Sequence, residues 1–332
     1  MFSHTSLFQR SCVLVCAAVL VVALAPKVGH AQVARVELHP FQSTTLTDQQ
    51  FLTGQKEGKP VMLAGELRIP KPGTDRLPAV ILLHPSGGVS GYVDDWARML
   101  NGMGVATFVC DSFSGREIVS TINDQDQLGM LTMIVDAYRA LELLAKHPRI
   151  DPERIALMGF SRGGRAALYA SLKRFQRMYA PPGLAFATYI AFYPPCDTTY
   201  LNDNDVADKP IRIFHGNADD FVPIAPCRSY VERLRKAGKD VQLTEYAGAY
   251  HLFDAATLKT PQKLPQAQTL RHCPQLEEAA DGRIMDSQTK QTFTYKSDPC
   301  VERGATIAYD PQAHTEAQKA VRELVTAVLR PN

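Results

Sequence analysis

Apolar and polar positions along residues 61–330 predict strands and helices in turn. Short, continuously apolar or alternating runs are typical of strands, and we expect strands at 61–70, 76–85, 105–111, 154–160, 186–194, 210–216 and 240–248. Apolar residues at helical spacing predict helices at 92–104, 125–148, 162–174, 225–238 and 315–330. This alternation indicates an α/β fold with a mostly parallel central sheet and helices on both faces.

Residues 255–312 interrupt the pattern. They lack clear periodicity, are rich in Gln, Thr, Asp and Lys, and contain Cys273 and Cys300. A loop of that length inside a compact domain is uncommon. We interpret the segment as a late insertion, with a small hairpin, closed by its own Cys273–Cys300 disulfide.

The first 31 residues resemble a secretory signal peptide. Arg10 is followed by an apolar run at 11–25, and Gly29 and Ala31 occupy the small-residue positions of a cleavage site. The run is shorter than the roughly 20 residues that span a bilayer. We expect cleavage after Ala31, one domain over 32–332, and a secreted or periplasmic protein without a membrane span. An uncleaved anchor is the alternative.

Composition and charge exclude some classes of partner. The chain of 332 residues has a formal net charge of +2 and an ordinary share of hydrophobic residues, so nothing favours nucleic-acid binding. The chain has no C-x-x-C pair, which argues against a zinc or thioredoxin-like site. We expect no metal and no organic cofactor.

The segment "RIALMGFSRGG" contains the first candidate for chemistry. Ser161 stands between Gly159 and Gly163, after a predicted strand and before a predicted helix. This is the context of the nucleophile elbow, in which a sharp turn exposes a serine hydroxyl above the sheet. The motif alone is weak, because the same letters also form ordinary turns. Its context favours a nucleophile.

A serine nucleophile needs a base and an orienting carboxylate. Asp219 and Asp220 follow the strand at 210–216, and His251 follows the strand at 240–248. The order Ser, Asp, His matches the α/β-hydrolase triad, and all members come at carboxyl ends of predicted strands. Taken alone, Asp219 is equally often a solvated loop carboxylate, and a lone histidine such as His251 is more often a packing residue. Their joint occurrence favours a triad.

Acyl transfer also requires hydrogen-bond donors for the developing oxyanion. The backbone amide of Arg162, directly after the serine, is one candidate. The second is expected from the glycine-bearing loop after the strand at 76–85, which reads "HPSGG". We assign it to the amide of Ser86, with Gly87 as the alternative.

Four motifs together resemble the dienelactone hydrolase family of α/β-hydrolases. They are "HPSGG", "GFSRG", "HGNADDFVP" and "YAGAYHLF". The resemblance implies an α/β-hydrolase fold, and it selects Asp219 as the acid because the family's aspartate precedes the proline, here Pro223, by four residues. It also implies a substrate-binding role for Arg116, for which an ordinary surface arginine is the alternative. This chain has serine where well-known members have cysteine, and no arginine follows His251 closely.

The family's strand order has a consequence for the cysteines. It places the strands before Cys196 and Cys227 side by side, which implies a Cys196–Cys227 disulfide, and two reduced neighbours are the alternative. Cys110, at the end of a buried strand, is then a free thiol.

The function expected from these features is hydrolysis of small carboxylic esters or lactones through an acyl-enzyme on Ser161. A peptidase of the same fold and a non-catalytic binding protein are the alternatives.

Overall fold

The computed structural model describes residues 1–2 and 33–331. The apolar run and cleavage site of the predicted signal peptide fall within residues 3–32 and lie outside the described residues. Chain contacts separate Met1–His30 from Ala31–Asn332, and the second unit contains every helix and strand described below. In the described ranges, no helix combines the length and apolar character needed to cross a membrane.

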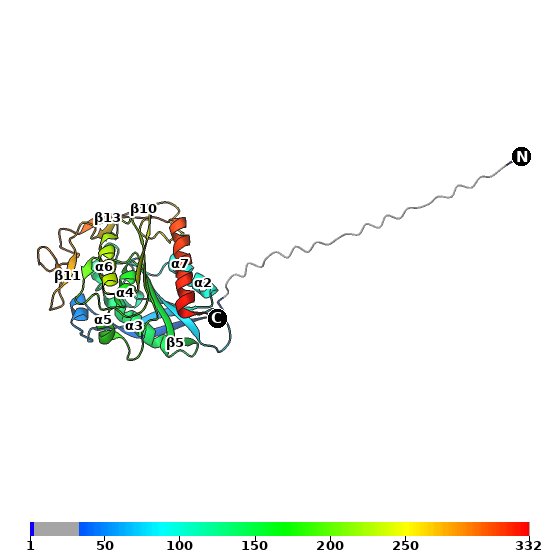
Figure 1. Ribbon diagram of the computed structural model, residues 1–332, viewed down its shortest axis with the longest axis horizontal. Coiled ribbons are helices and arrows are strands. Elements are labelled where there is room, and N and C mark those ends of the chain that lie inside the picture. Colours follow the sequence, from blue (N-terminus) through cyan, green and yellow to red (C-terminus); the bar gives the residue numbers. More distant parts are fainter. Residues whose placement is uncertain (3–32, 332) are drawn as a thin grey trace. The chain divides into compact units, whose positions relative to one another are not determined.

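A central sheet of eight strands carries the fold (Figure 1). Its first two pairings, β1 with β2 and β2 with β4, are antiparallel, and all later pairings are parallel. In sheet order the strands are β1 (Arg35–Thr45), β2 (Lys59–Ile69), β4 (Ala106–Asp111), β3 (Leu77–Leu83), β5 (Ile150–Phe160), β6 (Tyr189–Phe192), β8 (Ile211–Gly216) and β9 (Val241–Tyr246).

Helices cover both faces of the sheet, and each face has its own core (Figure 1). Side chains alternate along β3, so that Ile81 packs into one core and Leu82 into the other. One face carries α2 (Gly91–Gly102) and α7 (Pro311–Leu329). The other carries α3 (Thr132–Ala145), α4 (Arg162–Tyr169), α5 (Lys173–Tyr179) and α6 (Ala225–Lys236). This is the doubly covered α/β architecture that the hydrophobic pattern predicted.

The segment expected as an insertion forms two small sheets. Strand β10 (Gln262–Thr269) pairs antiparallel with β13 (Glu302–Ile307). Strand β11 (Leu276–Glu278) pairs with β12 (Ile284–Asp286) and with the short β7 (Thr198–Thr199) of the main domain. The insertion is therefore bound to the main domain by backbone hydrogen bonds.

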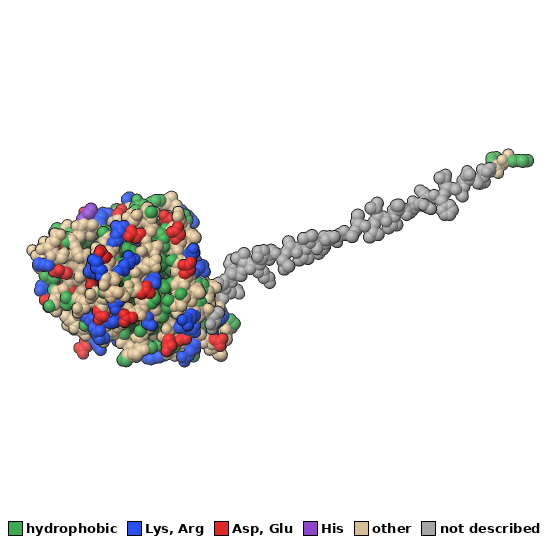
Figure 2. All heavy atoms as spheres, in the orientation of Figure 1, with side chains coloured by type: hydrophobic (Ala, Val, Ile, Leu, Met, Phe, Trp, Pro, Cys, Tyr) green, Lys and Arg blue, Asp and Glu red, His purple; other side chains and the backbone are tan. Residues whose placement is uncertain are grey.

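Both expected disulfides are present. Cys196–Cys227 links the loop after β6 to α6, and Cys273–Cys300 closes the insertion. Cys110 is a buried free thiol, and burial raises its pKa. On the visible face, basic and acidic side chains are interspersed (Figure 2).

Two expected helices differ from the observed ones. The predicted helix at 125–148 begins only at Thr132, because groups that would make helical hydrogen bonds are used elsewhere: the carbonyls of Gln125 and Leu128 accept from the Arg162 guanidinium, and the Leu131 amide donates to the Asp48 carboxylate. The predicted helix at 162–174 is divided into α4 and α5. The edge strand β1 and the five-residue helix α1 (Asp48–Leu52) were not predicted.

The expectation that Arg116 binds substrate is wrong, because its guanidinium is already paired inside the protein. Arg116 lies in the short 3-10 helix η1 (Ser114–Arg116) after β4. Its Nη1 and Nη2 each donate at 2.8 Å to the carboxylate of Asp136 on α3, and its Nε donates to Thr45 Oγ1. The two side chains are 4% and 0% exposed. The ion pair therefore joins η1 to α3.

We expect Arg116→Leu to lower the free energy of unfolding by about 3–5 kcal/mol, because it leaves the Asp136 carboxylate buried and unpaired. Denaturant titration measures the change. The control is Arg98→Leu, which removes a mostly exposed partner of Asp95 and should cost at most about 1 kcal/mol. A change in the preference for acidic over neutral esters, at unchanged stability, would restore the substrate-binding role of Arg116.

Candidate active site

The turn between β5 and α4 holds Ser161 in a strained conformation. Ser161 has φ 52° and ψ −112°, outside the regions that side-chain-bearing residues favour. Its amide donates to the Phe192 carbonyl on the neighbouring strand, which supports the turn. A Cβ at Gly159 would lie 2.1 Å from the Gly163 carbonyl oxygen. The glycine at 159 is therefore required by the close approach of the chain to itself.

Ser161, His251 and Asp219 form a continuous line of hydrogen bonds. The Ser161 Oγ lies 3.0 Å from His251 Nε2, and His251 Nδ1 lies 2.7 Å from Asp219 Oδ2. All three residues are buried, with Ser161 6% and His251 2% exposed. The residues come from the ends of β5, β8 and β9, as the sequence predicted. This geometry suits a nucleophile, a base and an orienting acid.

Asp219 is bound as a carboxylate on both of its oxygens. Its Oδ1 accepts the amides of Phe221 and Val222. Burial opposes ionisation, but the charge and hydrogen bonds of His251 and His215 outweigh it and hold the pKa of Asp219 well below its usual range. The carboxyl is thus ionised and fixes the imidazole's Nδ1–H.

Asp220 points away from the histidine. Its carboxylate accepts the amide and the hydroxyl of Thr306 on β13, both at 2.7 Å. The two adjacent aspartates therefore have different roles: Asp219 contacts His251, and Asp220 binds the insertion to the acid loop.

The His251 ring is held between two aromatic side chains. Its centroid lies 4.5 Å from that of Tyr193 and 4.9 Å from that of Phe221. The Tyr193 hydroxyl donates to Asp254, which also accepts from Trp96, both at 2.7 Å. Burial raises the pKa of Asp254. This buried group behind the histidine was not expected from the sequence.

The two residues expected to supply oxyanion amides, Arg162 and Ser86, line the same cavity as Ser161. The Arg162 amide is the first of α4, where N–H groups have no partner inside the helix. The Ser86 loop lies beside it and is fixed by His84, whose Nε2 accepts the Ser112 amide while Nδ1 donates to the Pro85 carbonyl. Burial lowers the pKa of His84, so its ring is neutral. A neutral ring suits both hydrogen bonds.

Gln125 connects the two halves of this donor pair, and sequence reasoning missed it. Its Oε1 accepts from the Ser86 hydroxyl at 3.2 Å and from Arg162 Nη2 at 2.8 Å. No feature of the sequence indicates this role, because Gln125 lies in a segment whose pattern predicts a helix. The structure instead places it in the 3-10 turn η2 (Gln125–Gln127).

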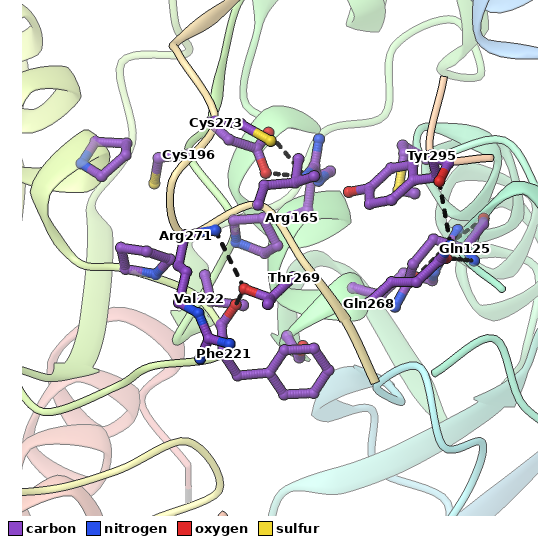
Figure 3. Close-up of a pocket in the computed structure, with 18 of the residues that line it drawn as sticks. Gln125, Arg165, Cys196, Phe221, Val222, Gln268, Thr269, Arg271, Cys273 and Tyr295 are labelled. Atoms are coloured by element: carbon purple, nitrogen blue, oxygen red, sulfur yellow. Dashed lines mark hydrogen bonds and ion pairs between the residues drawn. The ribbon is translucent and has the colours of Figure 1, made fainter. Parts of the chain in front are cut away.

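Two cavities meet at Ser161. The polar cavity, of about 350 Å³, has walls that include Gln125, Arg165, Gln268, Arg271 and Tyr295 (Figure 3). The apolar cavity, of about 220 Å³, is lined on the insertion side by Leu258, Leu264 and Ile307. Ser86, Ser161 and Phe221 line both. Arg116 lines neither.

One cluster in the described chain has the residue types of a metal site. Glu37, His39 and His147 bring ligand atoms within 4.8 Å of one another. However, His147 Nδ1 accepts the Arg149 amide, so the ring proton is on Nε2, which donates to Glu37 at 3.2 Å. His39 Nε2 lies 2.8 Å from the same carboxylate. In this structure the three residues are therefore joined by hydrogen bonds.

Comparisons with known proteins agree with this geometry. The model of the dienelactone hydrolase family matches residues 63–281. A relative from Bradyrhizobium sp., named as a probable 2-oxo-3-(5-oxofuran-2-ylidene)propanoate lactonase, is 24% identical over 189 residues, which cover 54% of this chain and 75% of the relative.

Solved structures share the fold. P91, a dienelactone hydrolase-like promiscuous phosphotriesterase from metagenomic libraries, has a TM-score of 0.55 at 15% identity, covering 88% of this chain and 98% of its own. MGS-M1, an α/β-hydrolase enzyme from a deep-sea metagenome library of the Medee basin, has a TM-score of 0.50 at 16% identity, covering 81% and 93%. Likeness at this identity shows the α/β-hydrolase fold.

The matched range extends over well more than half of the chain and includes Ser161, Asp219 and His251. The chain therefore belongs to the dienelactone hydrolase family, a family of α/β-hydrolases that cleave carboxylic esters.

Proposed function

We propose that this protein is a serine hydrolase that cleaves small carboxylic esters or lactones through an acyl-enzyme on Ser161. The observation that carries the proposal is the hydrogen-bonded line from Ser161 through His251 to Asp219. The Bradyrhizobium relative named as a lactonase supports the substrate class, since a lactone is an internal ester.

The proposed reaction begins with acylation. His251 Nε2 takes the hydroxyl proton as Ser161 Oγ bonds to the carbonyl carbon, and the amides of Arg162 and Ser86 hydrogen-bond the resulting oxyanion. The carbon–oxygen bond to the alcohol breaks, and His251 gives its proton to the leaving oxygen. Water then attacks the acyl-enzyme with His251 again as base, which releases the acid and regenerates Ser161.

We also propose that the protein is exported and that its mature chain, over 32–332, begins at Gln32. The signal-peptide pattern of residues 1–31 supports this. So do the two disulfides, because disulfides persist in oxidising compartments.

Ser161→Ala and His251→Ala should each reduce kcat for a small ester by about 10⁶-fold. The first removes the only atom that can form the acyl-enzyme, and the second leaves the hydroxyl protonated. Initial-rate measurements and labelling with a fluorophosphonate test both, and the double variant should be scarcely slower than either single one. Normal esterase activity in Ser161→Ala would refute the acyl-enzyme.

The two adjacent aspartates offer a matched comparison. Asp219→Asn should reduce kcat by about 10⁴-fold, because an amide no longer fixes the Nδ1–H tautomer of His251. Asp220→Asn should change kcat less than about tenfold, because its carboxylate contacts Thr306 instead. If Asp220→Asn were the more damaging variant, the acid of the triad would be Asp220 instead of Asp219.

Gln125 should act as a positioning residue for the oxyanion donors. We expect Gln125→Leu to lower kcat on the order of tenfold to a hundredfold with little change in KM, because the Ser86 loop and Arg162 lose their common acceptor. Gln125→Glu keeps an acceptor oxygen but adds a negative charge beside Arg162, so it should recover only part of the loss. The control is Gln127→Leu in the same turn, whose amide contacts only backbone carbonyls. A rise in KM as large as the fall in kcat, with no recovery in Gln125→Glu, would contradict the positioning role of Gln125.

A further inference from the structure

We propose that the two cavities divide the substrate, so that an apolar alcohol group occupies the apolar cavity and a polar acyl group occupies the polar cavity. The inference rests on the acyl-enzyme mechanism proposed above and adds the substrate's orientation and chemistry. Its first basis is that Ser161 lines both cavities.

His251 decides which side receives the alcohol. In acylation the imidazolium must give its proton to the leaving oxygen, which requires hydrogen-bond contact between Nε2 and that oxygen. His251 lines the apolar cavity, whereas the described residues that line the polar cavity do not include it. The leaving oxygen therefore lies on the apolar side, and the group attached to it continues into the apolar cavity.

The walls of the apolar cavity suit a hydrocarbon. Ile122, Leu252, Leu258, Leu264 and Ile307 form much of its lining. Among its described lining residues there is no carboxylate, lysine or arginine. At about 220 Å³ it is smaller than the roughly 300–1,000 Å³ typical of a site for a whole ligand. It therefore fits one part of a substrate.

The polar cavity has different chemistry. Arg162 and Arg165 line it, are each 2% exposed, and each has an Nε without a hydrogen-bond partner. Arg165 is paired with Asp197, whose carboxylate it contacts at 2.7 and 2.9 Å. The guanidinium of Arg162 instead donates to uncharged oxygens, the carbonyls of Leu128 and Gly129 and those of Gln125.

The polar groups of this wall favour an acyl group that carries hydrogen-bond acceptors. A plain alkyl chain in the polar cavity would displace water from the accessible polar side chains, among them the partly exposed guanidinium of Arg271, without replacing the hydrogen bonds of that water, which costs binding. Tyr295, Gln125 and Gln268 lie together on one side of the cavity, and Phe221, Thr269 and Arg271 on another (Figure 3). An acyl oxygen between them meets polar groups from both the main domain and the insertion.

Two series of esters separate the two sides. The first contains acetates of straight-chain alcohols from methanol to hexanol, and the second contains methyl esters of straight-chain acids from acetate to hexanoate. Each enzymatic rate is divided by the rate of alkaline hydrolysis of the same ester, which removes differences in intrinsic reactivity. We expect kcat/KM to rise by about fourfold per methylene along the alcohol series until the apolar cavity is full. Along the acid series it should stay level or fall, and methyl 4-oxopentanoate should exceed methyl pentanoate.

Variants test the assignment from each side. Leu264→Trp fills the apolar cavity and should lower the ratio of kcat/KM for hexyl over methyl acetate by at least tenfold. Leu264→Ala enlarges the cavity and should move the optimum to a longer alcohol. Ser229→Trp narrows the polar cavity and should instead lower kcat/KM for methyl 4-oxopentanoate relative to methyl acetate. Val36→Trp, on the exposed face of β1, is the control for an added tryptophan.

Acyl transfer gives a second measurement that does not depend on variants. The acyl-enzyme formed from one acetate should partition toward added hexanol more than toward added methanol at equal concentration, because hexanol binds where the leaving group was. A rise along the acid series with a level alcohol series would invert the orientation, and equal behaviour of both series would refute the division. If wild-type protein hydrolyses no ester faster than Ser161→Ala does, the proposed function itself fails.

Discussion

The close backbone packing at Gly163 is the constraint on which the site depends. A Cβ at this position would lie 2.4 Å from the carbonyl oxygen of Leu83 and 2.6 Å from that of His84. Helix α4 therefore begins directly against the end of β3, the strand from which the Ser86 loop leaves. One contact thus sets the distance between the proposed nucleophile and the loop that carries the proposed second oxyanion donor. The parallel order of β5, β8 and β9 then brings Asp219 and His251 to the same edge of the sheet.

The insertion completes the substrate walls that this edge lacks. Leu258, Leu264 and Ile307 close the apolar cavity, and residues 268–275 close part of the polar one. Both disulfides have a cysteine in the polar cavity's lining, Cys196 in one and Cys273 in the other. A disulfide closing a loop of this length contributes about 3–4 kcal/mol in the chain-entropy model. The cross-links therefore stabilise the walls in a part of the chain with little regular secondary structure.

Residues whose position is set by the end of a strand could be predicted from the sequence. Residues whose role depends on the direction of the side chain could not. Ser161, Asp219 and His251 each follow a strand, so the topology alone brings them together, and the structure joins them by hydrogen bonds. Arg116 also follows a strand, but its direction is decided by Asp136 on α3, a partner that no local pattern reveals. Gln125 was missed for a related reason. Its segment has a helical pattern, and the hydrogen bonds that hold it outside the helix come from residues distant in the sequence.

Arg162 carries a buried charge beside the candidate nucleophile. Burial lowers its pKa to about 10, and nearby Arg165 adds repulsion, yet the guanidinium remains charged at neutral pH. It also stands at the N-terminus of α4, where the helix dipole is positive and a second positive charge is unfavourable. The buried positive charge and the helix dipole both favour negative charge beside Ser161. The proposed reaction needs such stabilisation when the oxyanion forms. A tetrahedral oxyanion brings that charge, so the repulsion present in the resting site is relieved as the reaction proceeds. The guanidinium donates its hydrogen bonds to the neutral oxygens of Gln125, Leu128 and Gly129, and the carboxylates of Asp48 and Asp126 act on it through charge without a hydrogen bond.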